Sequence, residues 1–120
     1  MAPGGGGHNL ILVDRALERR VAEGRPVSVA MAGAGFMARG IARELARRPG
    51  VELAAILCRD PEKGRRIARE AGLASTLVTP HVPEAVEAGA DVFLEVTGSL
   101  EFGARAVLEA IGRRRHIVLM

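Results

Sequence analysis

Short, mostly apolar runs alternate along the chain with segments in which apolar residues recur every three or four positions. The short runs are rich in β-branched residues, which is typical of strands that are buried on both faces of a sheet. The periodic segments are typical of helices that bury one face. Five strands are predicted, at residues 27–32, 51–58, 76–78, 91–97 and 116–120. Helices are predicted at residues 10–24, 36–48, 61–72, 83–88 and 100–112.

The regular alternation of strands and helices predicts a parallel sheet that is covered by helices on both faces. Five strands in this order favour an α/β fold with a Rossmann-type doubly wound sheet, in the spatial order 3-2-1-4-5. We expect one such domain over residues 25–120, preceded by a helix at residues 10–24. The glycine-rich residues 1–9 are expected to be a flexible leader.

Composition and charge narrow the function classes. Apolar residues make up 48% of the chain, but no run reaches the length that a membrane span needs, so we expect no membrane partner. The net charge is +3, the arginines are dispersed and the only aromatic residues are three Phe, which argues against nucleic-acid binding. The lone Cys58 cannot form an internal disulfide, which fits a reducing, cytoplasmic setting.

A glycine-rich fingerprint, G-x-G-x-x-A, joins the first predicted strand to the next helix at residues 33–38. In this context the fingerprint is typical of dinucleotide binding. Gly33 permits the tight turn, Gly35 lets a pyrophosphate approach the backbone, and Ala38 keeps the helix close to the strand. Phe36 and Met37 begin the helix, whose N–H groups attract phosphate, so both are candidate contacts. The alternative is a glycine turn that binds nothing.

The residues at the end of the second predicted strand bear on the choice between NAD and NADP as the cofactor. NAD-binding domains usually place an acidic residue there, on the ribose hydroxyls. This chain has Arg59 instead, and Asp60 is expected to cap the following helix. The planar guanidinium of arginine suits a 2′-phosphate, which favours NADP over NAD. There are two alternatives. Arg59 is an exposed loop residue without a role, or Asp60 turns toward the ribose and the domain binds NAD.

The end of the fourth strand carries further candidate contacts. Thr97 and Gly98 follow that strand at the expected topological switch point, where the hydroxyl can bind ribose or carboxamide and the glycine admits the cofactor. Ser99 is either a helix cap or a ligand contact. Glu95 is unusual in an apolar strand and either reaches the crevice or points to solvent. Cys58 lacks an assignable base, and the three histidines are too scattered to predict a metal site.

Four segments in order resemble the N-terminal part of homoserine-dehydrogenase-like NAD(P)-dependent oxidoreductases, in particular the group that carries a C-terminal SAF domain. They are Val13–Leu17, Gly33–Gly40, Glu95–Gly98 and Glu101–Arg105. Ala38 stands where this family often has glycine. Relatives continue well beyond the position of Met120, so the resemblance implies a domain that is incomplete at its C-terminal end.

The resemblance implies hydride transfer between a nicotinamide and a small hydroxy or carbonyl substrate. The family's catalytic residues lie beyond Met120, so none is assigned, and the resemblance carries over only cofactor contacts, at Gly33, Gly35, Ala38, Arg59, Thr97 and Gly98. The expected partner is the dinucleotide. A small-molecule substrate would bind only together with the missing part, and a homo-oligomer is compatible. The alternatives are another oxidoreductase, sugar-type or dihydrodipicolinate-reductase-like, and a nucleotide-sensing module without catalysis.

Overall fold

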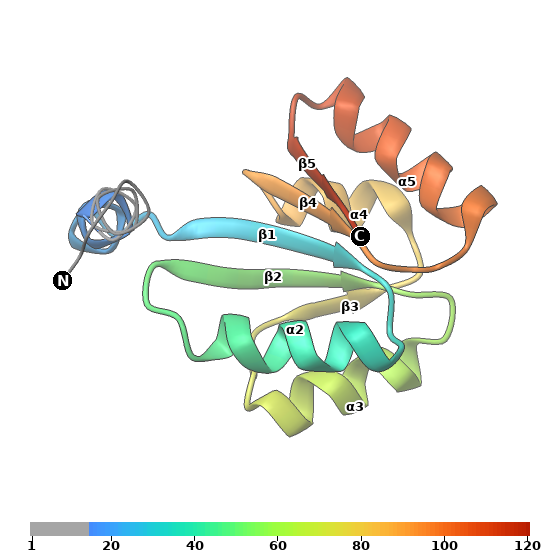
Figure 1. Cartoon of the computed structure of the whole chain (residues 1–120), viewed down its shortest axis with the longest axis horizontal. Coiled ribbons are helices and arrows are strands. Elements are labelled where there is room, and N and C mark those ends of the chain that lie inside the picture. Colours follow the sequence, from blue (N-terminus) through green and yellow to red (C-terminus); the bar gives the residue numbers. More distant parts are fainter. Residues whose placement is uncertain (1–14) are drawn as a thin grey trace, which may run out of the picture.

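A five-stranded parallel sheet forms the centre of the computed structural model, which describes residues 15–120 (Figure 1). Its order is β3-β2-β1-β4-β5, and every neighbouring pair is parallel. The strands are β1 (Val27–Ala32), β2 (Val51–Leu57), β3 (Leu77–Thr79), β4 (Val92–Glu95) and β5 (His116–Leu119). This topology confirms the predicted Rossmann-type doubly wound sheet.

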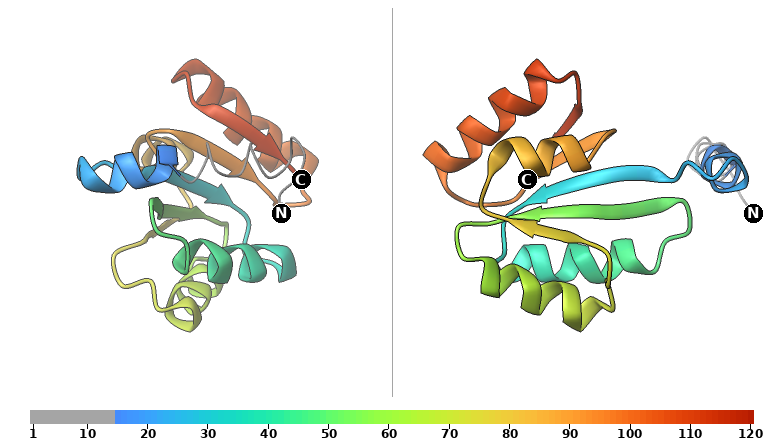
Figure 2. Two further views of the ribbon diagram at one scale, coloured as in Figure 1. Left: turned by 60° about the vertical axis from the view of Figure 1, so that its left-hand side comes forward. Right: turned by 180° about the vertical axis from the view of Figure 1, so that it is seen from behind.

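Two pairs of helices cover the two faces of the sheet (Figures 1 and 2). The helices are α2 (Phe36–Ala46), α3 (Pro61–Ala71), α4 (Val82–Ala88) and α5 (Leu100–Gly112). Helices α2 and α3 pack on the face that contains Met31 and Ile56, and α4 and α5 pack on the face that contains Phe93. Most of the helix residues that reach the core are alanines, which lets the helices lie close to the sheet.

Helix α2 buries its small residues more completely than its large ones. Met37, Ile41 and Leu45 recur every four residues, with Ala38 and Ala42 beside them, but Met37 is half exposed and, in this helix, only Ala38 and Ala42 are fully buried. Ala38 and Ala42 belong to the same buried cluster as Val29 and Met31 of β1. Ile41 and Leu45 pack at the border of this core.

The predicted ends of several elements shift by one or two residues. Strand β3 begins at Leu77 rather than at residue 76, and β4 ends at Glu95 rather than at residue 97. The early end of β4 has a local cause, because the Thr97 N–H donates to the Glu95 carboxylate instead of to a neighbouring strand. The predicted start of α3 is correct: the Asp60 side chain accepts a hydrogen bond from Glu62 N at 3.1 Å.

A helical segment at residues 15–22 precedes the sheet and lies beyond the amino end of β1 (Figure 1). Its Arg20 forms an ion pair with Asp91 at 3.0 Å, and the same carboxylate accepts a hydrogen bond from Ser28 N at 2.8 Å. These contacts hold the pKa of Asp91 below its usual value, chiefly through the Ser28 N–H and then through the charge of Arg20. The predicted leader and residues 10–14 of the predicted helix lie outside the described residues.

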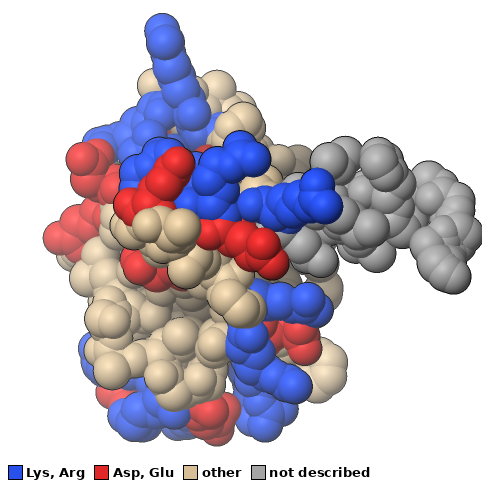
Figure 3. Space-filling model, turned by 90° about the vertical axis from the view of Figure 1, so that its left-hand side faces the viewer, with Lys and Arg blue, Asp and Glu red and all other residues tan. Residues whose placement is uncertain are grey.

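Charges of both signs are interspersed on the end of the molecule that carries the amino ends of the strands (Figure 3). Several arginines there belong to short ion pairs, such as Arg48 with Glu44 and Arg113 with Glu109. Mixed charges of this kind do not form a one-sign surface field. Within residues 15–120, no helix combines the length and the apolar character that crossing a membrane requires.

Candidate functional site

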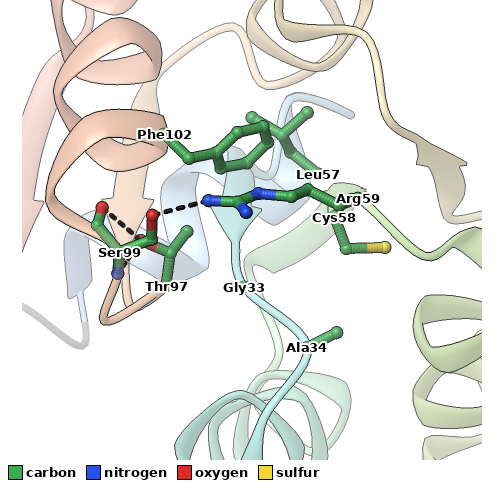
Figure 4. A pocket seen from close by; sticks show the side chains of 8 residues that line it. All are labelled: Gly33, Ala34, Leu57, Cys58, Arg59, Thr97, Ser99 and Phe102. Carbon is green, nitrogen blue, oxygen red and sulfur yellow. Dashed lines mark hydrogen bonds between the residues drawn. The ribbon is translucent and has the colours of Figure 1, made fainter.

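A pocket of about 330 Å³ opens at the carboxyl ends of the strands, where β1, β2 and β4 meet (Figure 4). Three of the predicted site residues, Gly33, Arg59 and Thr97, come together in its lining although they lie far apart in the sequence. The lining is completed by Ala34, Leu57, Cys58, Ser99 and Phe102. Doubly wound sheets bind their ligands in this position, outside the strand ends at the topological switch point.

Gly33 fixes the floor of the pocket. Its φ is +133°, a conformation that side chains rarely adopt. A Cβ at this position would lie 2.8 Å from the carbonyl oxygen of Val96. The close approach of the segment after β4 therefore requires a glycine at position 33. The Gly33 N–H donates to Leu57 O at 2.9 Å, which ties the same turn to β2. The glycine therefore brings three strand ends to one point.

The start of α2 presents backbone rather than side chains. Gly35 precedes the helix without a side-chain cap, the first turn carries no acidic residue, and a Cβ on Gly35 would meet no atom within 4 Å. Ala38 is fully buried, as its place in the fingerprint requires. The side chains of Phe36 and Met37, 89% and 50% exposed, do not line the pocket. Only backbone atoms of these two residues remain as candidate contacts.

Arg59 reaches across the pocket from the end of β2 to the start of α5 (Figure 4). Its Nη2 donates to Ser99 Oγ at 2.6 Å, and its Cζ lies 5.0 Å from the centroid of the Phe102 ring. Among the described residues, no carboxylate forms an ion pair with it. Ser99 stands at the N-cap position of α5, but its hydroxyl forms no cap and binds Arg59 instead, which corrects the simpler interpretation as a cap.

Glu95 neither points to solvent nor enters this pocket. Its carboxylate oxygen Oε1 accepts the Thr97 N–H at 2.7 Å and also the Thr97 hydroxyl. Gly103 makes room for this arrangement, because a Cβ there would lie 2.9 Å from the Glu95 carboxylate. The Thr97 hydroxyl in turn accepts the Ser99 N–H at 3.0 Å. Glu95 therefore sets the course of the chain from β4 into α5, which sequence reasoning missed.

Gly98 lies beside the pocket rather than in it. It has a φ of +70° and lines an adjacent pocket of about 400 Å³, together with Glu95, Leu100 and Leu119. Its predicted contact with the cofactor stays a prediction. The positive φ favours a glycine in this turn, which joins the end of β4 to the start of α5.

Cys58 lies at the edge of the pocket, and its side chain points away from the Arg59 guanidinium (Figure 4). Its thiol donates to Asp60 O at 3.3 Å, and burial raises the pKa of the thiol above its usual value. A thiol with a raised pKa is a poor nucleophile. Within residues 15–120, no group of His, Cys, Asp and Glu side chains is arranged to hold a metal ion.

Comparison with known proteins finds a likeness to a solved structure. No protein-family model and no curated protein matches the sequence. The structure is similar to apo histidine-tagged saccharopine dehydrogenase (L-Glu forming) from Saccharomyces cerevisiae, with a TM-score of 0.62 and 23% sequence identity. The match covers 76% of this chain and 21% of that chain, so the chain spans about a fifth of its structural neighbour. At this identity the likeness shows the fold, and the resemblance to the homoserine-dehydrogenase-like group stays a prediction.

Proposed function

We propose that this domain binds a nicotinamide dinucleotide, with NADP favoured over NAD, as the cofactor domain of an oxidoreductase. One observation carries the proposal: Arg59 extends from the end of β2 across the pocket to Ser99, without a carboxylate partner among the described residues. An unpaired guanidinium beside a glycine-lined helix start suits a ligand that carries several phosphates.

The residues present fit a dinucleotide. The open space at Gly35 and the uncapped first turn of α2 suit a pyrophosphate, which would accept hydrogen bonds from the backbone N–H groups there. The β4–α5 turn, with Thr97 and Gly98, would flank the nicotinamide half. The structural neighbour is a dehydrogenase by name, which supports an oxidoreductase.

The preference for NADP rests on which residue at the end of β2 is available to a ribose. Asp60 is engaged, since its carboxylate accepts the Glu62 N–H at the start of α3. Arg59 lines the pocket and presents a planar set of donors, which suits the bidentate recognition of a phosphate. NAD, whose ribose lacks that phosphate, would lose this contact.

The reaction proposed for the whole oxidoreductase is hydride transfer to or from a small hydroxy or carbonyl substrate, in the cytoplasm. The nicotinamide ring supplies the hydride chemistry, and this domain binds and positions it. Homoserine-dehydrogenase-like specificity is proposed on the resemblance of the four sequence segments. No residue of this chain is proposed as catalytic, because the pocket offers no base beside a reacting position. A nucleotide-sensing role without catalysis would use the same pocket.

Isothermal titration calorimetry of the 120-residue chain tests the proposal. The chain has no Trp, so heat is a more direct signal than intrinsic fluorescence. Arg59→Ala should weaken NADP binding by about 1–3 kcal/mol, which is the typical loss for a charged hydrogen bond, and leave NAD nearly unchanged. Arg47→Ala is the matched control, because Arg47 is exposed at the far end of α2.

Three outcomes contradict different parts of the proposal. Equal losses for NADP and NAD in Arg59→Ala would show that Arg59 does not contact the 2′-phosphate. Tighter binding of NAD by the wild-type chain would overturn the NADP preference and favour Asp60 as the ribose contact. A wild-type chain that binds neither dinucleotide would refute dinucleotide binding by this domain.

A further inference from the structure

The start of helix α5 holds the side chain of Arg59 in the pocket. The Nη2 of Arg59 donates to Ser99 Oγ at 2.6 Å, and its Cζ lies 5.0 Å from the centroid of the Phe102 ring (Figure 4). Within residues 15–120, this arginine forms no ion pair. Its backbone lies at the solvent-exposed end of β2, so the place of the guanidinium in the pocket depends on two residues of α5.

Both contacting residues are themselves fixed. The Ser99 N–H donates to the Thr97 hydroxyl oxygen at 3.0 Å, and the Glu95 carboxylate accepts the hydrogen of the same hydroxyl. The Ser99 hydroxyl forms no cap on α5, which leaves its oxygen free to accept from Arg59. Phe102 packs against the buried cluster on the α4–α5 face of the sheet. The guanidinium therefore contacts two groups whose positions are set by the end of β4 and by the core.

These contacts leave most of the guanidinium donors available. Arginine has five N–H donors, and the hydrogen bond to Ser99 uses one of them. The others can bind two oxygens of a phosphate in the bidentate arrangement that arginine favours. A long side chain that is free in solvent loses rotamer freedom when it binds a ligand, whereas a side chain that is already held has less freedom to lose.

We propose that Ser99 and Phe102 are positioning residues, which hold Arg59 across the pocket and so increase the preference of the domain for NADP over NAD. The inference rests on the proposed function, in which Arg59 binds the 2′-phosphate. Ser99 and Phe102 act through Arg59 and do not contact that phosphate. NAD has no 2′-phosphate for Arg59 to bind, so its affinity is insensitive to how Arg59 is held.

Calorimetric titration of the 120-residue chain with NADP and with NAD tests the role of Ser99. Ser99→Ala should weaken NADP binding about two- to tenfold, the range that corresponds to immobilising one side chain, and change NAD binding less than about twofold. Ser99→Thr keeps a hydroxyl and should retain most of the affinity for NADP. Ser75→Ala is the matched control, because Ser75 is exposed and precedes β3 at the opposite end of the sheet.

A double-mutant cycle distinguishes positioning from direct contact. If Ser99 acts through Arg59, Ser99→Ala should cause no further loss of NADP affinity in the Arg59→Ala background. An additional loss as large as in the wild-type background would show that Ser99 contacts the ligand directly, and would overturn its positioning role. Phe102→Leu removes the ring and should also lower the ratio of NADP to NAD affinity, whereas Phe102→Tyr keeps the ring and should preserve that ratio.

The failure of this inference and that of the proposed function give different results. A Ser99→Ala variant with the wild-type ratio of NADP to NAD affinity would overturn the inference, while Arg59→Ala still reports on the proposed function. Equal losses for both dinucleotides in Ser99→Ala would assign Ser99 a purely structural role. A wild-type chain that binds neither dinucleotide would refute both proposals. Thermal unfolding of Ser99→Ala should match the wild type closely, because the hydroxyl caps no helix, so this variant tests the inference even if Phe102→Leu is destabilised.

Discussion

Gly33 and Gly35 of the fingerprint are expected to have different roles. Replacing Gly33 with alanine should mainly lower the stability of the fold, and replacing Gly35 with alanine should mainly weaken dinucleotide binding. At Gly33 the backbone has a φ of +133°, and a Cβ would lie 2.8 Å from Val96 O and 2.9 Å from Val96 C. The strained backbone costs about 1–3 kcal/mol. Displacing the Val96 backbone costs a further 1–3 kcal/mol or so, as is typical of overpacking. Gly33→Ala should therefore lose about 2–6 kcal/mol of unfolding free energy.

At Gly35 neither cost arises. Its φ of −93° is open to alanine, and the space around its Cβ position is empty within 4 Å. The expected loss of stability is below about 1 kcal/mol, the scale for exchanging glycine for alanine at an N-cap. If a pyrophosphate approaches the backbone there, the added methyl group would occupy its place. Gly35→Ala should therefore fold normally and bind NADP at least about tenfold more weakly, a loss of about 1.4 kcal/mol.

Urea unfolding followed by far-ultraviolet circular dichroism measures the first effect, and calorimetric titration with NADP measures the second. The loss expected for Gly33→Ala corresponds to a fall in melting temperature of roughly 8–24 °C for a domain of this size. A Gly33→Ala variant as stable as the wild type would refute the close approach of Val96. A Gly35→Ala variant that binds NADP like the wild type would show that the ligand does not pass over this backbone.

Two further predictions concern ionisable groups. Asp91 has a pKa below its unfolded value because of the Ser28 N–H and Arg20, so its contribution to stability is present above about pH 4 and is lost as the pH falls through the lower folded pKa. Asp91→Asn should thus be less stable than the wild type at pH 6, in urea titrations, and the gap should narrow below pH 4 or so; a constant gap would contradict this. Cys58, buried and with a raised pKa, should react with a chromogenic disulfide reagent at neutral pH much more slowly in the folded chain than in urea, and equal rates would show that the thiol is accessible.

The elements and their order could be predicted because each depends on local pattern. Apolar runs predicted the strands, Asp60 and Pro61 predicted the start of α3, and the alternation of elements predicted the parallel sheet. Gly33 was predicted correctly as the turn because the fingerprint places a glycine directly after the first strand, and the backbone there has a positive φ. These features require knowledge of a few adjacent residues only.

The side-chain partners in the site could not be predicted in this way. Arg59 and Ser99 are 40 residues apart, and nothing in either neighbourhood indicates that they bond. Glu95 was recognised as unusual, but its contact with Thr97 depends on the space that Gly103 leaves on α5. Hydrophobic periodicity indicates which face of an element is buried, whereas these contacts depend on the distances between elements.

The sheet order has a consequence for how the site forms. Strand β1 is central: Val29 pairs with Leu53 on one side, from the strand that follows next, and with Val92 on the other, from much later in the chain. The pairing of β1 with β2 closes over the single connection that contains α2, whereas the pairing of β1 with β4 closes over a much longer segment, from α2 to α4, and carries a larger entropic cost. The pocket straddles this junction, with Gly33 and Arg59 on one half and Thr97 and Ser99 on the other. A ligand that contacts both halves therefore stabilises the longest-range pairing of β1, so that binding and the completion of the sheet are thermodynamically linked.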